Sequence, residues 1–172
     1  ENTIAVQVTN KQPSSRWYSG SGIYRDVTLS YRDKVQVAEN GNHITTPKLA
    51  EQKDGNVETQ IQSKIKNTAK TLAKVFVEQQ IFTKEGKAVS DLVRSVTKTL
   101  SGNETADFKQ TILVNKPTLW TTKSYNPQLY VLKTKVYNEG QLVDVTEDTF
   151  GYRYFNWTAK EGFSLNGERM KF

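Results

Sequence analysis

The acidic and histidine side chains are the first places to look for catalytic chemistry in this 172-residue chain. His43 is the single histidine, and the sequence contains no cysteine. A Ser/His/Asp relay, a thiol nucleophile and a site built from several histidines or cysteines therefore cannot be assembled from these residues. His43 follows Asn40-Gly41-Asn42, which predicts a loop or strand-edge position for its ring. We expect no metal at this position.

Two pairs of carboxylates, Glu104 with Asp107 and Glu147 with Asp148, have the chemistry of a general acid and base. Neither pair lies in a recognisable motif, and charged turns explain both. The glycines of Gly20-Ser21-Gly22 suggest a dinucleotide-binding loop, but position 25 is arginine and no helical pattern follows. The sequence therefore predicts no cofactor and no catalytic residues.

The positive charge is spread along the chain. Lysine and arginine number 24 against 18 aspartates and glutamates, which gives a formal net charge of +6. Many of the lysines alternate with apolar residues, as at Lys64 and Lys66 or Lys133 and Lys135, which places them on the solvated side of a strand. Nucleic-acid-binding domains usually gather their charge on one face, so we expect no nucleic-acid partner. No apolar run approaches the ~18 residues of a membrane-spanning helix, and we expect no membrane partner.

Alternation of apolar and polar residues with a period of two predicts the fold. Val57, Thr59, Ile61, Ser63 and Ile65 share one face of a strand whose other face is polar. Similar patterns occupy three further segments, 75–82, 108–114 and 130–136. Asn138-Glu139-Gly140 predicts a hairpin turn into Leu142–Val145, because glycine adopts the positive φ that such turns require. Short strands between regular turns predict an all-β sandwich of about seven antiparallel strands.

The segment from Val89 to Leu100 carries two conflicting patterns. Its apolar residues follow helical spacing, and Ser90 could cap a helix. Its β-branched residues, among them Val93, Val96 and Thr97, favour a strand. We predict a strand and leave the helix as the alternative.

Three motifs then stand out in fixed order. Residues 16–27 read RWYSGSGIYRDV, residues 117–120 read PTLW and are followed by NPQLY at 126–130, and residues 150–153 read FGYR and are followed by GFSLNG at 162–167. Together these motifs resemble glycoside hydrolase family 2, most closely its bacterial β-galactosidases. The resemblance covers nearly the whole chain, although residues 35–116 share only the strand pattern.

The resemblance implies a place in a multidomain enzyme. Residues 1–32 would be the last strands of a jelly-roll sugar-binding domain, 33–149 an immunoglobulin-like sandwich, and 150–172 the lead-in to a (β/α)₈ catalytic barrel. The barrel and the jelly-roll of the same parent chain would be the partners. The family hydrolyses glycosides with retention through two Glu carboxylates that would lie beyond Phe172, so the fragment would position the barrel and be inactive alone. A galactoside would bind only to the intact enzyme. The resemblance suggests an extracellular or cell-surface parent, and a cytoplasmic one stays open.

The same resemblance suggests roles for individual residues. Arg16 and Trp17 are the candidates for a sugar contact, or else they hold the jelly-roll against the barrel. An inter-domain structural role is expected for a second group, Tyr24, Arg25, Trp120, Tyr130 and Arg153. An autonomous carbohydrate-binding module is the alternative function, and it would present two or three aromatic rings on one exposed face.

The two ends of the chain are expected to be strands cut from larger sheets. Thr3–Val8, Ile23–Tyr31 and Glu168–Phe172 have strand-like patterns. Open strand edges are templates for pairing with another chain. We therefore expect self-association through residues 1–32.

Overall fold

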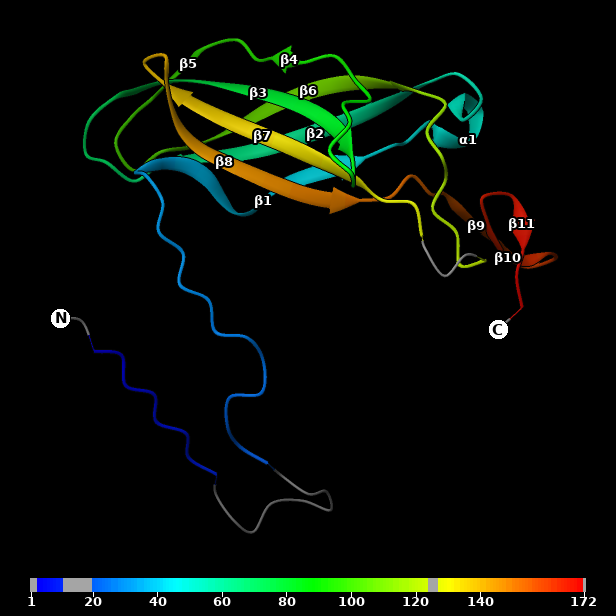
Figure 1. Ribbon diagram of the computed structural model, residues 1–172, viewed down its shortest axis with the longest axis horizontal. Helices are drawn as coiled ribbons and strands as arrows, with labels where there is room; N and C mark the ends of the chain where they lie inside the picture. The colour runs from blue at the N-terminus through cyan, green and yellow to red at the C-terminus, as the bar shows by residue number, and fades with distance from the viewer. Residues whose placement is uncertain (1–2, 11–19, 124–126, 172) are drawn as a thin grey trace. The chain divides into compact units, whose positions relative to one another are not determined.

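A computed structural model describes residues 3–10, 20–123 and 127–171 of the chain (Figure 1). The chain divides into two units, Glu1–Tyr31 and Arg32–Phe172. The second unit contains, in chain order, β1 (Val35–Thr45), α1 (Leu49–Gln52), β2 (Asn56–Asn67), β3 (Ala73–Thr83), β4 (Val93–Arg94), β5 (Lys98–Leu100), β6 (Thr105–Asn115), β7 (Tyr130–Asn138), β8 (Gln141–Phe150), β9 (Phe155–Thr158), β10 (Gly162–Leu165) and β11 (Glu168–Arg169).

Strands β1 to β8 form a sandwich of two antiparallel sheets (Figure 1). One sheet has the order β1-β2-β6, and the other has the order β4-β3-β7-β8, with β5 also paired to β3. Six of these strands are long and two, β4 and β5, are short. The predicted all-β, immunoglobulin-like sandwich is therefore confirmed.

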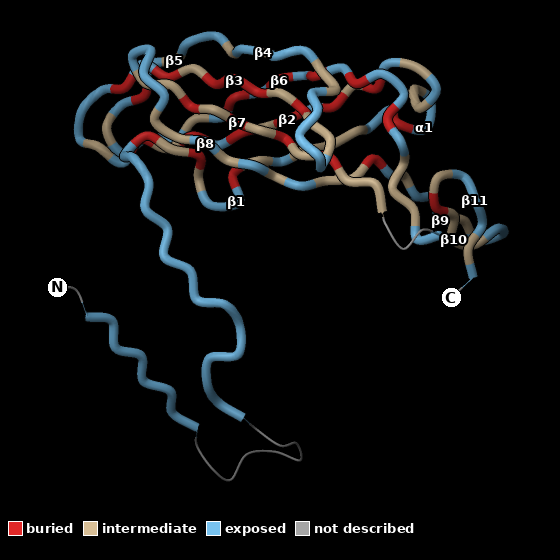
Figure 2. Tube along the Cα trace, in the orientation of Figure 1, coloured by how far each residue is buried: buried red, intermediate tan, exposed pale blue. Residues whose placement is uncertain are grey.

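The alternation in the sequence corresponds to the two faces of each strand. In β2, Val57, Thr59, Ile61, Ser63 and Ile65 are buried, while the residues that alternate with them are half-buried or exposed (Figure 2). The predicted hairpin is also confirmed: Asn138 pairs with Gln141 across a two-residue turn, in which Glu139 has φ 49° and Gly140 has φ 83°. Both central residues of this turn have positive φ, which matches the right-handed twist of the flanking strands.

Strand β3 has apolar residues on both faces because the outer face of its sheet is partly covered. The Arg94 guanidinium lies 4.6 Å from the centre of the Phe76 ring and donates to Glu78 Oε1 at 2.5 Å. The Phe76 ring also stacks on Tyr137 at a centroid distance of 4.7 Å. Burial raises the pKa of Glu78, but hydrogen bonds from Arg94 and Tyr137 outweigh it and hold the pKa below its ordinary value.

The ambiguous segment 89–100 is an interrupted edge strand, so the strand prediction is confirmed in its two short parts, β4 and β5. Between and beside these parts, serine hydroxyls take the place of backbone carbonyls along the edge of β3. Ser95 Oγ accepts the N–H of Val77 at 2.9 Å, and Ser90 Oγ accepts the N–H of Ile81 at 3.0 Å. The serine side chains satisfy these N–H donors of β3, so the backbone of the segment does not pair continuously with β3. The apolar residues of the segment therefore do not alternate regularly.

The strands expected near the ends of the chain differ from the prediction. Thr3–Val8 and Ile23–Tyr31 contain no strand, and β11 is limited to Glu168–Arg169. A strand exists only where a neighbour accepts its hydrogen bonds, and the two N-terminal segments have no such neighbour in the described chain. Their alternating apolar side chains are consequently exposed: Ile4, Val6, Val8, Ile23, Val27, Leu29 and Tyr31.

Candidate functional site at the junction of the sandwich and the C-terminal sheet

The residues that the sequence singled out for sugar contact, Arg16 and Trp17, lie outside the described residues. Tyr24 and Arg25 belong to the first unit and are both exposed. The Arg25 guanidinium lies 5.4 Å from the centre of the Tyr24 ring. The other three predicted structural residues, Trp120, Tyr130 and Arg153, meet in the second unit.

The carboxylate pairs do not form an acid–base site. Glu104 Oε2 accepts the N–H of Ser101 at 2.6 Å and closes a turn. Glu147 pairs with the Lys133 ammonium at 2.8 Å, whereas the Asp148 carboxylate accepts a hydrogen bond from the Asn42 amide at 2.6 Å. Consecutive residues of a strand point to opposite faces, so the Glu147 and Asp148 carboxylates diverge. The described residues contain no group of three or more His, Cys, Asp or Glu that could hold a metal ion.

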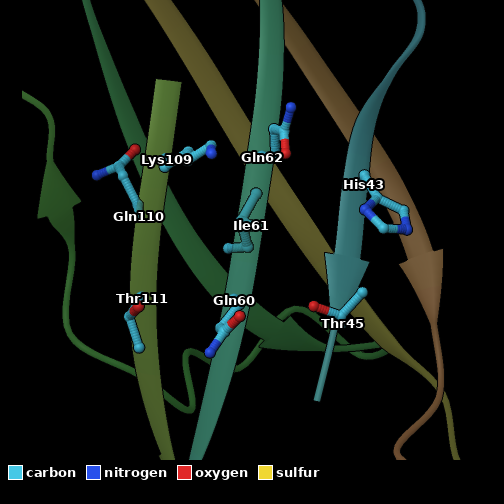
Figure 3. A pocket seen from close by; sticks show the side chains of 8 residues that line it. All are labelled: His43, Thr45, Gln60, Ile61, Gln62, Lys109, Gln110 and Thr111. Atoms are coloured by element: carbon cyan, nitrogen blue, oxygen red, sulfur yellow. The ribbon is translucent and has the colours of Figure 1, made fainter. Parts of the chain in front are cut away.

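His43 lies on β1 and lines a shallow groove on the outer face of the β1-β2-β6 sheet (Figure 3). The groove has a volume of about 350 Å³, and its polar lining is His43, Thr45, Gln60, Gln62, Lys109, Gln110 and Thr111. These side chains can donate hydrogen bonds to hydroxyl groups, but none of the lining residues is a carboxylate. The groove therefore has no pair of groups for general acid–base hydrolysis.

The second and third sequence motifs come together at one end of the sandwich, where the chain leaves β8 for the small β9-β10-β11 sheet. Gly151 packs directly on Trp120: a Cβ at Gly151 would lie 2.9 Å from Trp120 Cβ. The backbone N–H of Trp120 donates to the backbone carbonyl of Tyr152 at 2.8 Å. The Arg153 guanidinium lies over the Trp120 ring, 4.8 Å from its centre.

Asn166 connects the same tryptophan to the small sheet. Its Nδ2 donates to the Trp120 carbonyl at 2.8 Å, and its backbone N–H donates to the Tyr154 carbonyl at 2.8 Å. The Asn166 Oδ1 accepts the N–H of Tyr154 at 3.2 Å. Asn166 has φ 52°, a conformation that asparagine tolerates better than most residues. One side chain therefore ties the β10–β11 turn to both neighbouring segments.

Three aromatic rings anchor this junction in the sandwich core. Tyr130, Phe150 and Tyr152 pack with centroid distances between 5.0 and 6.2 Å. Tyr130 Oη accepts the N–H of Thr118 at 2.8 Å, and Tyr152 Oη is hydrogen-bonded to Thr59 Oγ1 at 2.8 Å. Burial raises the pKa of Tyr152 far above its ordinary value, so the phenol is neutral in the folded chain. The sequence motifs contained Gly151, Tyr152 and Asn166, but only their spatial contacts show what they do.

The β9–β10 hairpin next to the junction presents aromatic rings to solvent. Phe155 and Trp157 occupy alternate positions of β9 and are 71% and 69% exposed. The Phe163 ring lies 5.7 Å from Trp157 and 6.3 Å from Phe155. We call these three rings the aromatic face.

No helix in the described part of the chain is long and apolar enough to cross a membrane.

Comparison with known proteins shows which family shares this sequence and architecture. A family model for glycosyl hydrolases family 2 matches residues 41–153. The beta-galactosidase BoGH2A of Bacteroides ovatus is 35% identical over 171 residues, which cover 99% of this chain and 19% of that protein. A putative beta-glucuronidase of Formosa agariphila is 35% identical over 172 residues, covering 99% of this chain and 15% of that protein. A solved family 2 glycosyl hydrolase from Bacteroides cellulosilyticus superposes with a TM-score of 0.83 at 30% identity, over 95% of this chain and 22% of that chain.

The sandwich, its junction and these matches define an immunoglobulin-like β-sandwich module of a glycoside hydrolase family. The chain belongs to glycoside hydrolase family 2. It spans less than a quarter of the length of the relatives it matches. Those relatives include both a beta-galactosidase and a putative beta-glucuronidase.

The close contact between Gly151 and Trp120 leads to a prediction. Gly151→Ala should destabilise the chain by about 1–3 kcal/mol, because the added methyl must displace Trp120 from a packed position. Urea denaturation followed by tryptophan fluorescence measures the change. Gly55→Ala is the matched control, since its new Cβ would find only Gln52 O at an ordinary 3.8 Å. Equal stability of the two variants would contradict the role given to the contact.

Proposed function

We propose that this chain is a non-catalytic part of a retaining family 2 glycoside hydrolase, and that it positions the catalytic barrel of an enzyme that hydrolyses terminal β-D-galactosides. The junction carries the proposal: both parts of the third motif, residues 150–153 and Asn166, contact Trp120 of the second motif and connect the C-terminal sheet to the sandwich. Trp120, Tyr130 and Arg153 would thus act structurally between domains. In this proposal residues 1–32 belong to the jelly-roll, 33–149 to the sandwich and 150–172 to the lead-in to the barrel.

The catalytic carboxylates are proposed to lie in the barrel, outside this chain. Retaining hydrolysis needs two carboxyl groups about 5–5.5 Å apart, one as nucleophile and one as acid/base. The adjacent carboxylates Glu147 and Asp148 are each bound to a different partner, Lys133 and Asn42. The similarity to the beta-galactosidase BoGH2A supports a galactoside as the substrate of the whole enzyme.

Assays of turnover test this function. The purified 172-residue chain should not hydrolyse a chromogenic β-galactoside or β-glucuronide, because the proposal places both catalytic carboxylates in the barrel. The intact enzyme that contains this sequence should hydrolyse the β-galactoside with the higher kcat/KM. Turnover by the isolated chain that Glu147→Gln or Asp148→Asn abolishes would contradict the non-catalytic role. A higher kcat/KM for the β-glucuronide would contradict only the galactoside assignment.

One observation favours the alternative, an autonomous carbohydrate-binding module: the aromatic face presents Phe155 and Trp157 side by side with high exposure. Aromatic rings in such positions can stack on sugars, but they can equally pack against a neighbouring domain of the parent enzyme. We expect calorimetric titration of the isolated chain with millimolar galactose or lactose to give no binding heat. Saturable binding that Trp157→Ala removes and His43→Ala leaves intact would establish the binding-module function instead.

We also propose that the isolated chain self-associates through residues 1–32. The described parts of this stretch expose alternating apolar side chains, with Val27 at 79%, Leu29 at 89% and Tyr31 at 99%. Pairing as strands with another copy would bury these side chains and satisfy their backbone groups. Light scattering should show oligomers that grow with concentration. A chain beginning at Asp33 should be monomeric and should keep the circular dichroism signal of the sandwich strands. A monomeric full chain at high concentration would contradict this proposal.

A further inference from the structure

A polar layer crosses the interior of the sandwich. It consists of Ser63, Gln79, Gln110 and Thr134, one residue from each of β2, β3, β6 and β7. All four residues are more than nine-tenths buried. Each stands between two buried apolar neighbours on its own strand, so the layer separates the apolar core into two clusters. Buried polar groups are costly unless they are hydrogen-bonded, and the layer therefore needs a complete set of partners.

The hydrogen bonds of the layer have a defined direction. The Asp148 carboxylate accepts from Asn42 Nδ2 at 2.6 Å, which turns Asn42 Oδ1 toward the interior. Asn42 Oδ1 accepts from Ser63 Oγ at 2.5 Å, and Ser63 Oγ accepts in turn from Gln79 Nε2 at 2.9 Å. An ionised carboxylate can accept hydrogen bonds but cannot donate them. The charge of Asp148 therefore fixes the orientation of both amides.

In this orientation both hydrogens of Gln79 Nε2 are donated, and Gln79 Oε1 is left without a partner in the protein. Gln79 Nε2 donates to Ser63 Oγ and to Thr134 Oγ1, the second at 3.0 Å, and an amide nitrogen has only two hydrogens. Gln79 Oε1 is buried and has no partner in the protein. Exchanging the amide oxygen and nitrogen would not help, because it would remove both of these donations.

Gln110 adds two more buried polar atoms without a partner, Nε2 and Oε1. Gln110 faces Ile61 across the β2–β6 ladder, and Phe108 faces Ser63. Gln110 is therefore the diagonal neighbour of Ser63, a separation of roughly 7–8 Å between Cα atoms. Its side chain is buried in the same layer as Ser63, the residue that receives the Gln79 hydrogen bond. One acceptor from Gln79 and one donor and one acceptor from Gln110 remain unpaired in the same layer.

We propose that the sandwich binds a structural water molecule between the side chains of Gln79 and Gln110. The water donates to Gln79 Oε1 and accepts from Gln110 Nε2, or donates its second hydrogen to Gln110 Oε1. Water suits this site because the unpaired atoms include both donors and acceptors, and a buried water typically makes two to four such bonds. An apolar ligand would pair with none of these atoms, and a simple ion could not pair with both a donor and an acceptor. The site would complete the network that runs from Asp148 across both sheets.

A high-resolution crystal structure of the 172-residue chain tests the proposal, together with water-to-amide magnetisation transfer in ¹⁵N-labelled protein. We expect one ordered water within about 2.7–3.2 Å of Gln79 Oε1 and of a Gln110 amide atom, and transfer from a long-lived water to the Gln110 side-chain NH₂. A direct Gln79–Gln110 hydrogen bond in a dry interior would overturn the proposal. So would a Gln110 amide turned out to solvent.

Gln110→Leu separates the water site from the general need for a well-packed core. The leucine should abolish the ordered water and lower Tm less than Gln79→Leu does, because it leaves only Gln79 Oε1 buried without a partner. Gln79→Leu is the matched comparison: it removes the same bridging acceptor but also two hydrogen bonds to Ser63 and Thr134, and should lower Tm. An ordered water that persists unchanged in Gln110→Leu would overturn the assignment.

Discussion

The contact of Asn42 with the second sheet is the interaction on which the sandwich depends. Asn42 belongs to β1, and its amide nitrogen lies within 3.1 Å of Thr146 Oγ1 and 2.6 Å of an Asp148 oxygen on β8. This reach is made possible by the bulge in β1, where the register shifts between Val37 and Asn42. Gly41 is required in the bulge, because a Cβ there would lie 2.7 Å from the Ala38 carbonyl oxygen. Strict alternation from Val35 and Val37 would point the odd-numbered residues inward, so it is the bulge that aims Asn42 into the interior.

The two apolar clusters on either side of the polar layer provide non-directional stabilisation, while the layer fixes how the sheets align. Apolar burial tolerates small shifts of one sheet over the other. Hydrogen bonds from Asn42, Ser63 and Gln79 do not, because their geometry is narrow and unpaired buried groups are costly. This precise alignment matters at the junction, where Thr59 of one sheet bonds Tyr152, which follows the last strand of the other. The position of the C-terminal sheet therefore depends on the alignment of the sandwich.

Sequence reasoning located most of the strands and failed where partners were non-local. The alternation in 57–65 and the turn at Glu139-Gly140 are local signals, and both were predicted correctly. Thr3–Val8 shows the same alternation, yet it forms no strand, since alternation describes which face would be buried and cannot supply a neighbour. In 89–100 the hydroxyls of Ser90 and Ser95 replace ladder bonds of β3, an arrangement that no periodicity in the segment encodes.

By itself the sequence determined the all-β class, the hairpin turn at Glu139-Gly140 and the exclusion of sites built from several histidines or cysteines, because these follow from residue types and the short-range geometry of the backbone. Its motifs also pointed to the family. Only the tertiary structure decided that Glu147 and Asp148 diverge to Lys133 and Asn42, and that Trp120, Gly151 and Asn166 meet in one junction. The physical reason is that these relations join residues that are 14 to 106 positions apart in the sequence. Their contacts depend on sheet pairing and on the β1 bulge, which bring distant segments together.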